Sequence, residues 1–221
     1  FHDIFTGDRI SLRSDRIFHA ASILKLFVLI EVHKRVYETS VSLDDEIEIA
    51  AEFPGAVDGR PFAVDDADAL RARLGRADGR ATIRELCDAM IAGSNNCATN
   101  NLIRHLGGPA AITQAAHAAG ATRSRVPRYI MDAEAFARGI SAEICAGDVG
   151  TVLESLALGQ LINDDSSRNI IETLKLCEGG FLAEAIQGEE AEVAHKTGAI
   201  DGVRHDAGIV FTPNGAYVLV I

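Results

Sequence analysis

The segment Ser22-Ile23-Leu24-Lys25 places a hydroxyl group and an amine three residues apart. On a helix, residues i and i+3 lie on one face, so the Lys25 amine can contact the Ser22 hydroxyl. An amine whose pKa is lowered in a dry pocket can remove the serine proton and create a nucleophile. The S-x-x-K pattern alone arises by chance about once in a chain of this length. A helix-start serine beside a snorkelling lysine is the plain alternative.

Two further motifs strengthen this interpretation. Ser94-Asn95-Asn96 lies between two expected helices, where the Ser94 hydroxyl can pass a proton to a leaving amine and the Asn96 amide can orient a carbonyl. A helix N-cap is the alternative, since Ser and Asn are favoured there. Lys196-Thr197-Gly198 follows the apolar segment 193–195, where an ammonium and a hydroxyl group on an edge strand can hold a carboxylate. The glycine would let a substrate approach the backbone closely.

Periodicity and turn signals define the elements that must position these motifs. We expect a strand–turn–strand at 3–12 and strands at 193–195, 207–212 and 216–221, with Pro213-Asn214-Gly215 as a turn. Helices are expected between the strands, at 20–36, 68–74, 82–93, 94–106, 109–120, 145–158 and 167–177, with a capping box at Thr82 and Glu85. Residues 51–79 are expected to form a surface excursion and residues 121–141 an irregular loop.

This order of elements predicts an α/β fold, more closely an α+β sandwich, in which both termini form one antiparallel sheet and a helical lobe is inserted between them. We expect a single domain over residues 1–221, with a sheet subdomain at about 1–21 and 180–221 and a helical subdomain at about 22–179. The first residue is not Met and the last lies inside an apolar run, so both ends are expected to be cut from a longer chain.

The three motifs in this order resemble those of class A β-lactamases and penicillin-binding proteins. The wider segments 18–26, 90–100 and 196–208 are also similar to that family. The resemblance covers almost the whole chain apart from residues 51–79, and the family's terminal helices have no counterpart. It implies a β-lactamase/transpeptidase-like fold and a serine hydrolase that forms an acyl-enzyme.

Carried over residue by residue, the resemblance implies one catalytic and one substrate-binding set. The catalytic set comprises the nucleophile Ser22, the proton acceptor Lys25 and the proton shuttle Ser94. The substrate-binding set comprises Asn96, the carboxylate-binding Lys196 and Thr197, and Ala199. From the residues themselves we add Gly198, which adjoins the K-T-G hydroxyl, and Arg204 as a candidate second carboxylate anchor. The backbone amides of Ser22 and Ala199 would form the oxyanion hole.

The loop that should carry the deacylating base departs from the family pattern. Class A enzymes usually carry a glutamate six residues beyond the Thr of a Thr-Arg pair, and here that position holds Arg128. Asp132 is the candidate replacement, and it can either hold the hydrolytic water or cap the loop through its own backbone bonds. A triad of Ser22 with His205 and Asp206 is disfavoured, because adjacent side chains in a strand point in opposite directions.

Composition excludes other classes of partner. The net charge of −11 argues against nucleic acids and anionic membrane surfaces. No apolar run reaches the length of a membrane span, and neither a metal motif nor a cofactor motif is present, so no cofactor is expected.

The four cysteines show no C-x-x-C pair, and buried free thiols are expected, although a disulfide stays possible.

Three functional hypotheses follow. The first is a β-lactamase that hydrolyses its acyl-enzyme, and the second is a cell-wall D,D-peptidase or esterase for which β-lactams are slow substrates or inhibitors. The third is a non-catalytic sensor that binds a β-lactam or a peptide. The expected partner is a small-molecule β-lactam or a cell-wall peptide, and the family implies a secreted, periplasmic or cell-envelope location.

Overall fold

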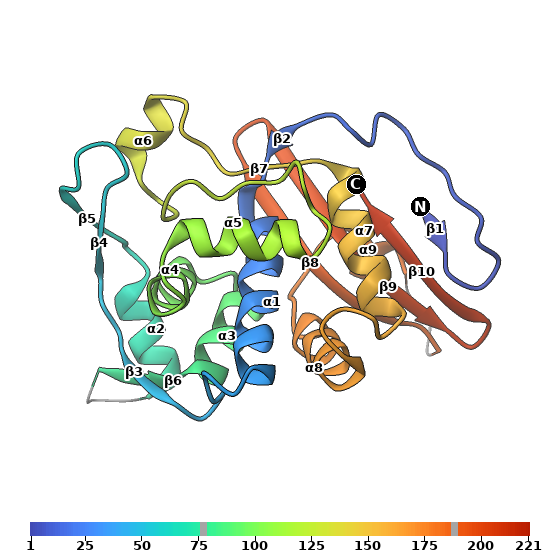
Figure 1. The fold of residues 1–221 in the computed structure, drawn as a ribbon, viewed down its shortest axis with the longest axis horizontal. Coiled ribbons are helices and arrows are strands. Elements are labelled where there is room, and N and C mark those ends of the chain that lie inside the picture. Colours follow the sequence, from blue (N-terminus) through green and yellow to red (C-terminus); the bar gives the residue numbers. More distant parts are fainter. Residues whose placement is uncertain (76–78, 187–189) are drawn as a thin grey trace.

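The structure is a computed structural model, and it describes residues 1–75, 79–186 and 190–221. Within these residues, four antiparallel strands form the main sheet in the order β1-β10-β9-β8. The sheet stands beside a lobe of helices (Figure 1). Its strands are β1 (His2–Asp3), β8 (Glu192–Ile200), β9 (Val203–Thr212) and β10 (Gly215–Val220). Because β1 pairs with β10, both ends of the chain meet in one sheet, as the sequence predicted.

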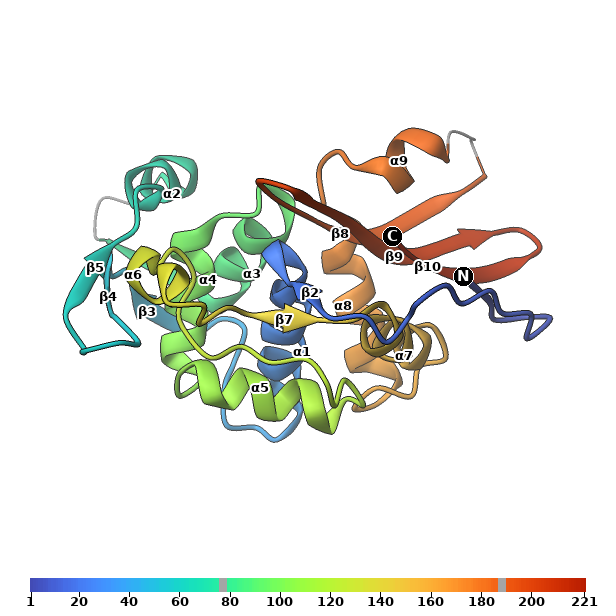
Figure 2. The same cartoon turned by 90° about the horizontal axis from the view of Figure 1, so that it is seen from above.

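The helical lobe surrounds α1 (Leu24–Tyr37), which continues from a short 3₁₀ turn, η1 (Ala21–Ile23). Residues 24–33 of α1 are all buried, which explains the nearly unbroken apolar sequence there. The other helices of the described chain are α2 (Ala67–Leu74), α3 (Ile83–Ala92), α4 (Asn96–His105), α5 (Pro109–Ala118), α6 (Ala133–Ala137), α7 (Ala146–Ala157), α8 (Asp164–Leu174) and α9 (Phe181–Ala185). Figure 2 shows α1 in the middle of this lobe, with α5 along one side.

Several local sequence signals define element ends as predicted. The Thr82 hydroxyl accepts the Glu85 backbone N–H, and the Glu85 carboxylate accepts the Thr82 N–H, which completes the capping box of α3. Pro109 stands in the first turn of α5. Residues 213–214 form the tight connection between β9 and β10. Helix α8 begins three residues earlier than expected, because the side chain of Asn163 caps it.

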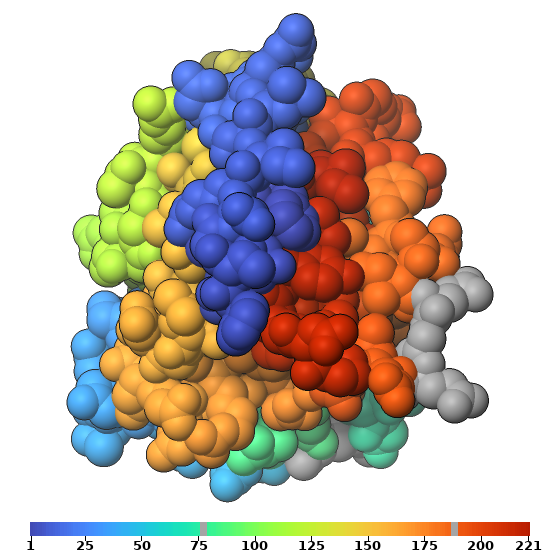
Figure 3. Space-filling model, turned by 90° about the vertical axis from the view of Figure 1, so that its right-hand side faces the viewer, coloured from blue at the N-terminus to red at the C-terminus, as the bar shows by residue number. Residues whose placement is uncertain are grey.

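The expected strand–turn–strand at 3–12 is correct in part. The Asp3 carboxylate accepts the N–H groups of Phe5 and Thr6 in a turn, after which residues 8–10 return antiparallel to residues 1–3 through backbone bonds between Phe1 and Ile10 and between Asp3 and Asp8. The returning segment forms a single bridge rather than a strand, and Leu12 beyond it lies exposed instead of in a core. Figure 3 shows this N-terminal segment running between α7 and β10 on the surface.

Three two-stranded antiparallel sheets, one of them next to η1, complete the described fold. The excursion contains β4 (Glu52–Pro54) paired with β5 (Pro61–Ala63), and its flanks contribute β3 (Glu46–Glu48) paired with β6 (Arg80–Thr82). The strands β2 (Phe18–His19) and β7 (Glu143–Ile144) pair just before η1. Helix α7 packs against β9 and β10. Although it belongs to the expected helical subdomain at 22–179, this helix therefore covers one face of the sheet.

All four cysteines lie in the described part of the chain, and each is a free thiol with a buried side chain. Burial raises the pKa of the Cys97 thiol to about 11 and also raises the pKa of Cys87. These thiols therefore behave as small apolar core groups, as expected for Cys87.

Candidate functional site

Ser22 lies on the tight turn η1, which strand β8 contacts. The preceding residue, Ala21, has a φ of +45°, a left-handed conformation that L residues rarely adopt. On the other side of this turn, a Cβ atom added to Gly198 would lie 3.1 Å from the backbone nitrogen of Ser22. The glycine of the K-T-G motif thus lets β8 pack directly against the nucleophile turn, whereas the sequence suggested that its role was to admit substrate.

Lys25 joins the first motif to the second. Its side chain is fully buried, and its Nζ donates to the Ser94 carbonyl at 2.5 Å, the Ser94 hydroxyl at 2.9 Å and the Asn96 Oδ1 at 3.0 Å. Burial, and next the positive charge of Lys196, hold the pKa of Lys25 well below its usual range. Ser94 has a φ of +53°, so the S-x-N turn also holds backbone strain.

Lys196 occupies the middle of β8 and is 1% exposed. Its Nζ donates to the Thr197 carbonyl at 3.1 Å and lies 3.8 Å from the Cys177 sulfur. Burial lowers the pKa of Lys196. The nearby Cys177 raises this pKa, but its effect is smaller than that of burial. Lys25 and Lys196 therefore bring two buried amino groups to one region of the site, close enough for the charge of Lys196 to lower the pKa of Lys25.

Asp66 is a site residue that sequence reasoning missed. Its carboxylate accepts the backbone N–H groups of Asn96 at 2.5 Å and Cys97 at 2.8 Å, at the start of α4. It thereby holds the S-x-N segment, and its negative charge raises the pKa of Lys25 against the effect of burial. Nothing in the sequence links Asp66 to residues thirty positions later, so only the fold shows this contact.

Asp132 has both carboxylate oxygens engaged by backbone amides. Its Oδ1 accepts the Ala135 N–H at 3.0 Å as the N-cap of α6, and its Oδ2 accepts the Ala56 N–H at 2.8 Å. The side chain thus ties the loop 121–141 to the β4–β5 connection. These contacts favour the capping alternative over the role of Asp132 as a water-holding base.

Arg128 is directed into its own loop. Its Nε donates to the Ile140 carbonyl at 2.6 Å, one Nη donates to the Tyr129 carbonyl at 3.0 Å, and the guanidinium lies 5.8 Å from the centre of the Phe136 ring. Ile130, by contrast, is tied to α4: its N–H donates to Asn100 Oδ1, and Asn100 Nδ2 donates to the Ile130 carbonyl, both at 3.0 Å.

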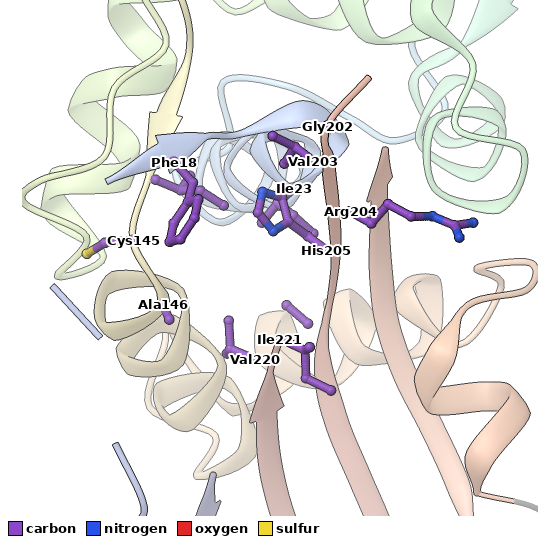
Figure 4. Close-up of a pocket in the computed structure, with 12 residues that line it drawn as sticks. Phe18, Ile23, Cys145, Ala146, Gly202, Val203, Arg204, His205, Val220 and Ile221 are labelled. Carbon is purple, nitrogen blue, oxygen red and sulfur yellow. The ribbon is translucent and has the colours of Figure 1, made fainter. Parts of the chain in front are cut away.

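Arg204 is exposed on β9 and lies over the Phe181 ring at 5.4 Å. Figure 4 shows its side chain pointing away from an apolar pocket of about 220 Å³ that Ile23, His205 and Val220 help to line. His205 instead donates from its Nε2 to the His19 carbonyl, 3.0 Å away. Asp206 pairs with the buried His195 at 2.7 Å, so the disfavoured triad with His205 has no geometric basis.

The described residues contain no group of three or more His, Cys, Asp or Glu side chains that could hold a metal ion. No helix in residues 1–75, 79–186 and 190–221 is both long enough and apolar enough to cross a membrane. The nucleophile turn packs against β8, the Lys25 amine of lowered pKa holds the Ser94 and Asn96 side chains, and β8 supplies a second amine and a hydroxyl group. This set of groups suits acyl transfer.

Sequence comparison places this geometry in a family. The model of the β-lactamase enzyme family matches residues 1–221. The β-lactamase of Streptomyces cellulosae is 34% identical over 146 residues, covering 63% of this chain and 46% of the relative. The β-lactamase of Rhodobacter capsulatus is 27% identical and is matched over 96% of this chain and 69% of its own length.

Solved structures agree with this placement. An ancestral class A β-lactamase has a TM-score of 0.82 at 27% identity, covering 99% of this chain and 81% of its own. A mutant of PBP-A, in an acyl-enzyme complex with penicillin G, has a TM-score of 0.74 at 27% identity over 99% of this chain and 77% of its own. The chain therefore belongs to the β-lactamase enzyme family, a family of serine hydrolases, and has the class A fold.

Proposed function

We propose that this protein is a serine β-lactamase of the class A type whose acyl-enzyme on Ser22 is hydrolysed slowly. The observation that carries the proposal is the Lys25 amine, which is buried, has a pKa well below its usual range and is bonded to both polar groups of the S-x-N motif. An amine whose pKa is lowered, and which follows a serine by three residues, is a suitable proton acceptor for acylation.

The proposed acylation uses residues of all three motifs. The Ser22 oxygen attacks the lactam carbonyl while its proton passes to Lys25, and the negative oxygen is held by the Ser22 and Ala199 amides. The carbon–nitrogen bond of the ring then breaks, and Ser94 passes the proton from Lys25 to the leaving nitrogen, consistent with their 2.9 Å separation. Lys196, Thr197 and Arg204 bind the carboxylate of the substrate, and Asn96 orients its amide carbonyl.

Slow deacylation is supported by the contacts of the loop 121–141. Hydrolysis of the ester needs a water molecule activated by another base. The two Asp132 oxygens are occupied by backbone amides, and Glu134 lies exposed in an ion pair with Arg138. Ile130, which Asn100 ties to α4, offers no proton acceptor in its side chain.

The same feature supports a second candidate, a cell-wall D,D-peptidase or esterase that β-lactams acylate and block. Such an enzyme needs the same serine nucleophile and the same site for the substrate carboxylate. It does not need a base that activates water if the amine of a second peptide, rather than water, attacks the acyl-enzyme. In either case the substrate is a β-lactam or cell-wall peptide outside the cytoplasm, so we propose a secreted, periplasmic or cell-envelope location.

Covalent labelling tests the nucleophile. A fluorescent penicillin should label the wild-type chain at one equivalent, and peptide mapping should locate the adduct on Ser22. Ser22→Ala should remove the label, while Ser11→Ala, an exposed serine in the N-terminal segment, should leave it unchanged. Stoichiometric labelling of the Ser22→Ala chain would rule out the assignment. Steady-state turnover of a chromogenic cephalosporin distinguishes slow hydrolysis from the blocked peptidase.

A further inference from the structure

His19 makes an unusual contact with the turn that carries the nucleophile. Its Nδ1 accepts the backbone N–H of Ala21 at 2.9 Å. Ala21 is the residue with a φ of +45°, and the next residue is Ser22. A strained backbone persists only where surrounding contacts hold it, and His19 supplies one of these contacts from strand β2.

The opposite side of the turn is held by β8. A Cβ atom on Gly198 would lie 3.1 Å from the Ser22 nitrogen and 3.2 Å from the Ala21 Cβ, so the strand backbone is in close contact with both residues. The turn is therefore held between His19 and Gly198. The direction of the Ser22 N–H depends on both sides, because a change at Ala21 rotates the peptide group that carries this N–H.

The contact requires one tautomer of the imidazole. Because Nδ1 accepts a hydrogen bond, a neutral His19 carries its proton on Nε2. That atom is buried and has no hydrogen-bond partner among the described residues. The proton arrangement is thus determined by the bond to Ala21 rather than by a second partner.

The surroundings of the ring keep it neutral. Burial, Arg128 and His205, in that order, lower the pKa of His19, and only Glu143 opposes them. Glu143 pairs with His19 across the β2–β7 strands, His205 contacts its carbonyl from β9, and Phe136 packs edge-on at 5.6 Å from α6. Nδ1 therefore stays available as an acceptor at neutral pH.

We propose that His19 is a positioning residue for acylation, which holds the Ala21–Ser22 turn through its Nδ1 and thereby aims the Ser22 N–H at the developing oxyanion. This inference rests on the proposed function, because it assumes that Ser22 is acylated. It assigns a role to a residue outside the three motifs, and no chemical step passes through His19 itself.

Two substitutions separate the hydrogen bond from the packing of the ring. His19→Asn places an amide oxygen close to the position of Nδ1, whereas His19→Leu fills similar space without an acceptor. We expect His19→Leu to lower the acylation rate constant for penicillin by about 10- to 100-fold, since small misplacements of catalytic groups cost up to about 100-fold. The dissociation constant of the initial complex should change less than threefold, and His19→Asn should recover most of the rate. Phe136→Leu, which removes the ring contacts to His19 and Arg128 but leaves the Nδ1–Ala21 hydrogen bond in place, is the matched control and should acylate at the wild-type rate.

Stopped-flow measurement with a chromogenic cephalosporin gives the two constants separately. Wild-type acylation kinetics in His19→Leu, or equal impairment of the Leu and Asn variants, would overturn the inference. Amide hydrogen exchange of the peptide spanning residues 19–24 provides a readout that does not depend on activity: exchange should be faster in His19→Leu than in His19→Asn, and equal exchange would also overturn it. Failure of the wild-type protein to label at Ser22 would instead contradict the proposed function, and the exchange comparison would still test the role of His19 in holding the turn.

Discussion

At the scale of single residues, the site depends on charged groups placed where water cannot reach them. Burying an ammonium group costs free energy unless the group is hydrogen-bonded or becomes neutral. Lys25 Nζ has three oxygen partners, and burial holds its pKa well below its usual range, which makes its proton easier to give up. This cost is the reason why a fully buried lysine among apolar neighbours marks a functional site rather than a core position.

The first prediction concerns the missing base. The Ile130 backbone is tied to Asn100, which lies one helical turn beyond the Lys25 partner Asn96 on α4, so we expect a longer side chain at position 130 to reach this part of the site. Ile130→Glu should raise the steady-state hydrolysis of a chromogenic cephalosporin by roughly 10²-fold, the lower end of general-base effects. The burst of about one equivalent should shrink as the acyl-enzyme stops accumulating.

Two comparisons complete this test. Ile130→Gln adds a similar polar group without a base and should keep the slow rate. Arg128→Glu should also keep it, because the Arg128 side chain faces the Ile140 and Tyr129 carbonyls inside the loop. Faster hydrolysis in Arg128→Glu but not in Ile130→Glu would show that the loop presents the other residue to the substrate.

The second prediction concerns Asp132. Asp132→Ala removes the cap of α6 and leaves the Ala56 N–H without its acceptor, so the free energy of unfolding should fall by about 1–3 kcal/mol. The midpoint of thermal unfolding should drop accordingly, while the deacylation rate constant stays within twofold of wild type. Normal stability combined with much slower deacylation would show that Asp132 holds the hydrolytic water after all.

At the scale of elements, helix α1 carries both the catalytic lysine and a second buried titratable group, His33. Residues 24–33 are buried on every side because α3, α4, α5 and α8 surround this helix. Glu31 in this stretch has Lys34 and Arg35 as ion-pair partners, whereas burial and the positive charge of Arg84 both disfavour a charged His33. The folded chain therefore favours the neutral form of His33.

The third prediction follows from this burial. Burial, together with Arg84, lowers the pKa of His33 to about 4, whereas an unfolded histidine titrates near 6.5. Between these pH values the unfolded chain binds more protons, so the free energy of unfolding falls as the pH drops from about 6.5 to 4, by about 3 kcal/mol in total. Urea unfolding across this range should show a flatter slope in His33→Gln. His105→Gln, at an exposed position on α4, should keep the wild-type slope.

At the scale of the whole molecule, the site forms where the two lobes meet. Ser22 comes from η1 and Lys25 from the first turn of α1, Ser94 and Asn96 come from the α3–α4 connection and the start of α4, and Lys196 comes from the sheet. The Lys25–Ser94 bond alone joins residues 69 positions apart. Global unfolding should therefore remove the site as one unit, because none of its groups is held by local structure alone.

The fourth prediction belongs to this scale. Neither the sequence motifs nor the side-chain clusters of the described residues provide a set of three metal-binding groups. Incubation with a chelator should leave acylation and turnover of a chromogenic cephalosporin unchanged. Loss of activity on chelation and its recovery with added zinc would contradict the proposed mechanism. The Ser22→Ala chain is the control, because any zinc-dependent hydrolysis that it retains does not pass through Ser22.

The sequence by itself determined those features that depend on neighbours a few positions apart. The capping box at Thr82, the proline start of α5, the strands at both ends and the order of the three motifs could all be predicted, because caps, turns and periodicity are local. The motif residues Lys25, Ser94, Asn96 and Lys196 also lie in one region, as their resemblance to the family implied.

Tertiary structure alone decided which distant groups meet. The bond from Asp66 to the start of α4, the engagement of Asp132 by Ala56, and the inward direction of Arg128 involve partners that no local pattern specifies. Counting six residues along the loop placed Arg128 at the position of the base, but the backbone bonds to Asn100 bring Ile130 to α4 instead. The physical reason is that a loop is positioned by whichever buried polar groups must find partners, and those partners are set by packing across the whole fold.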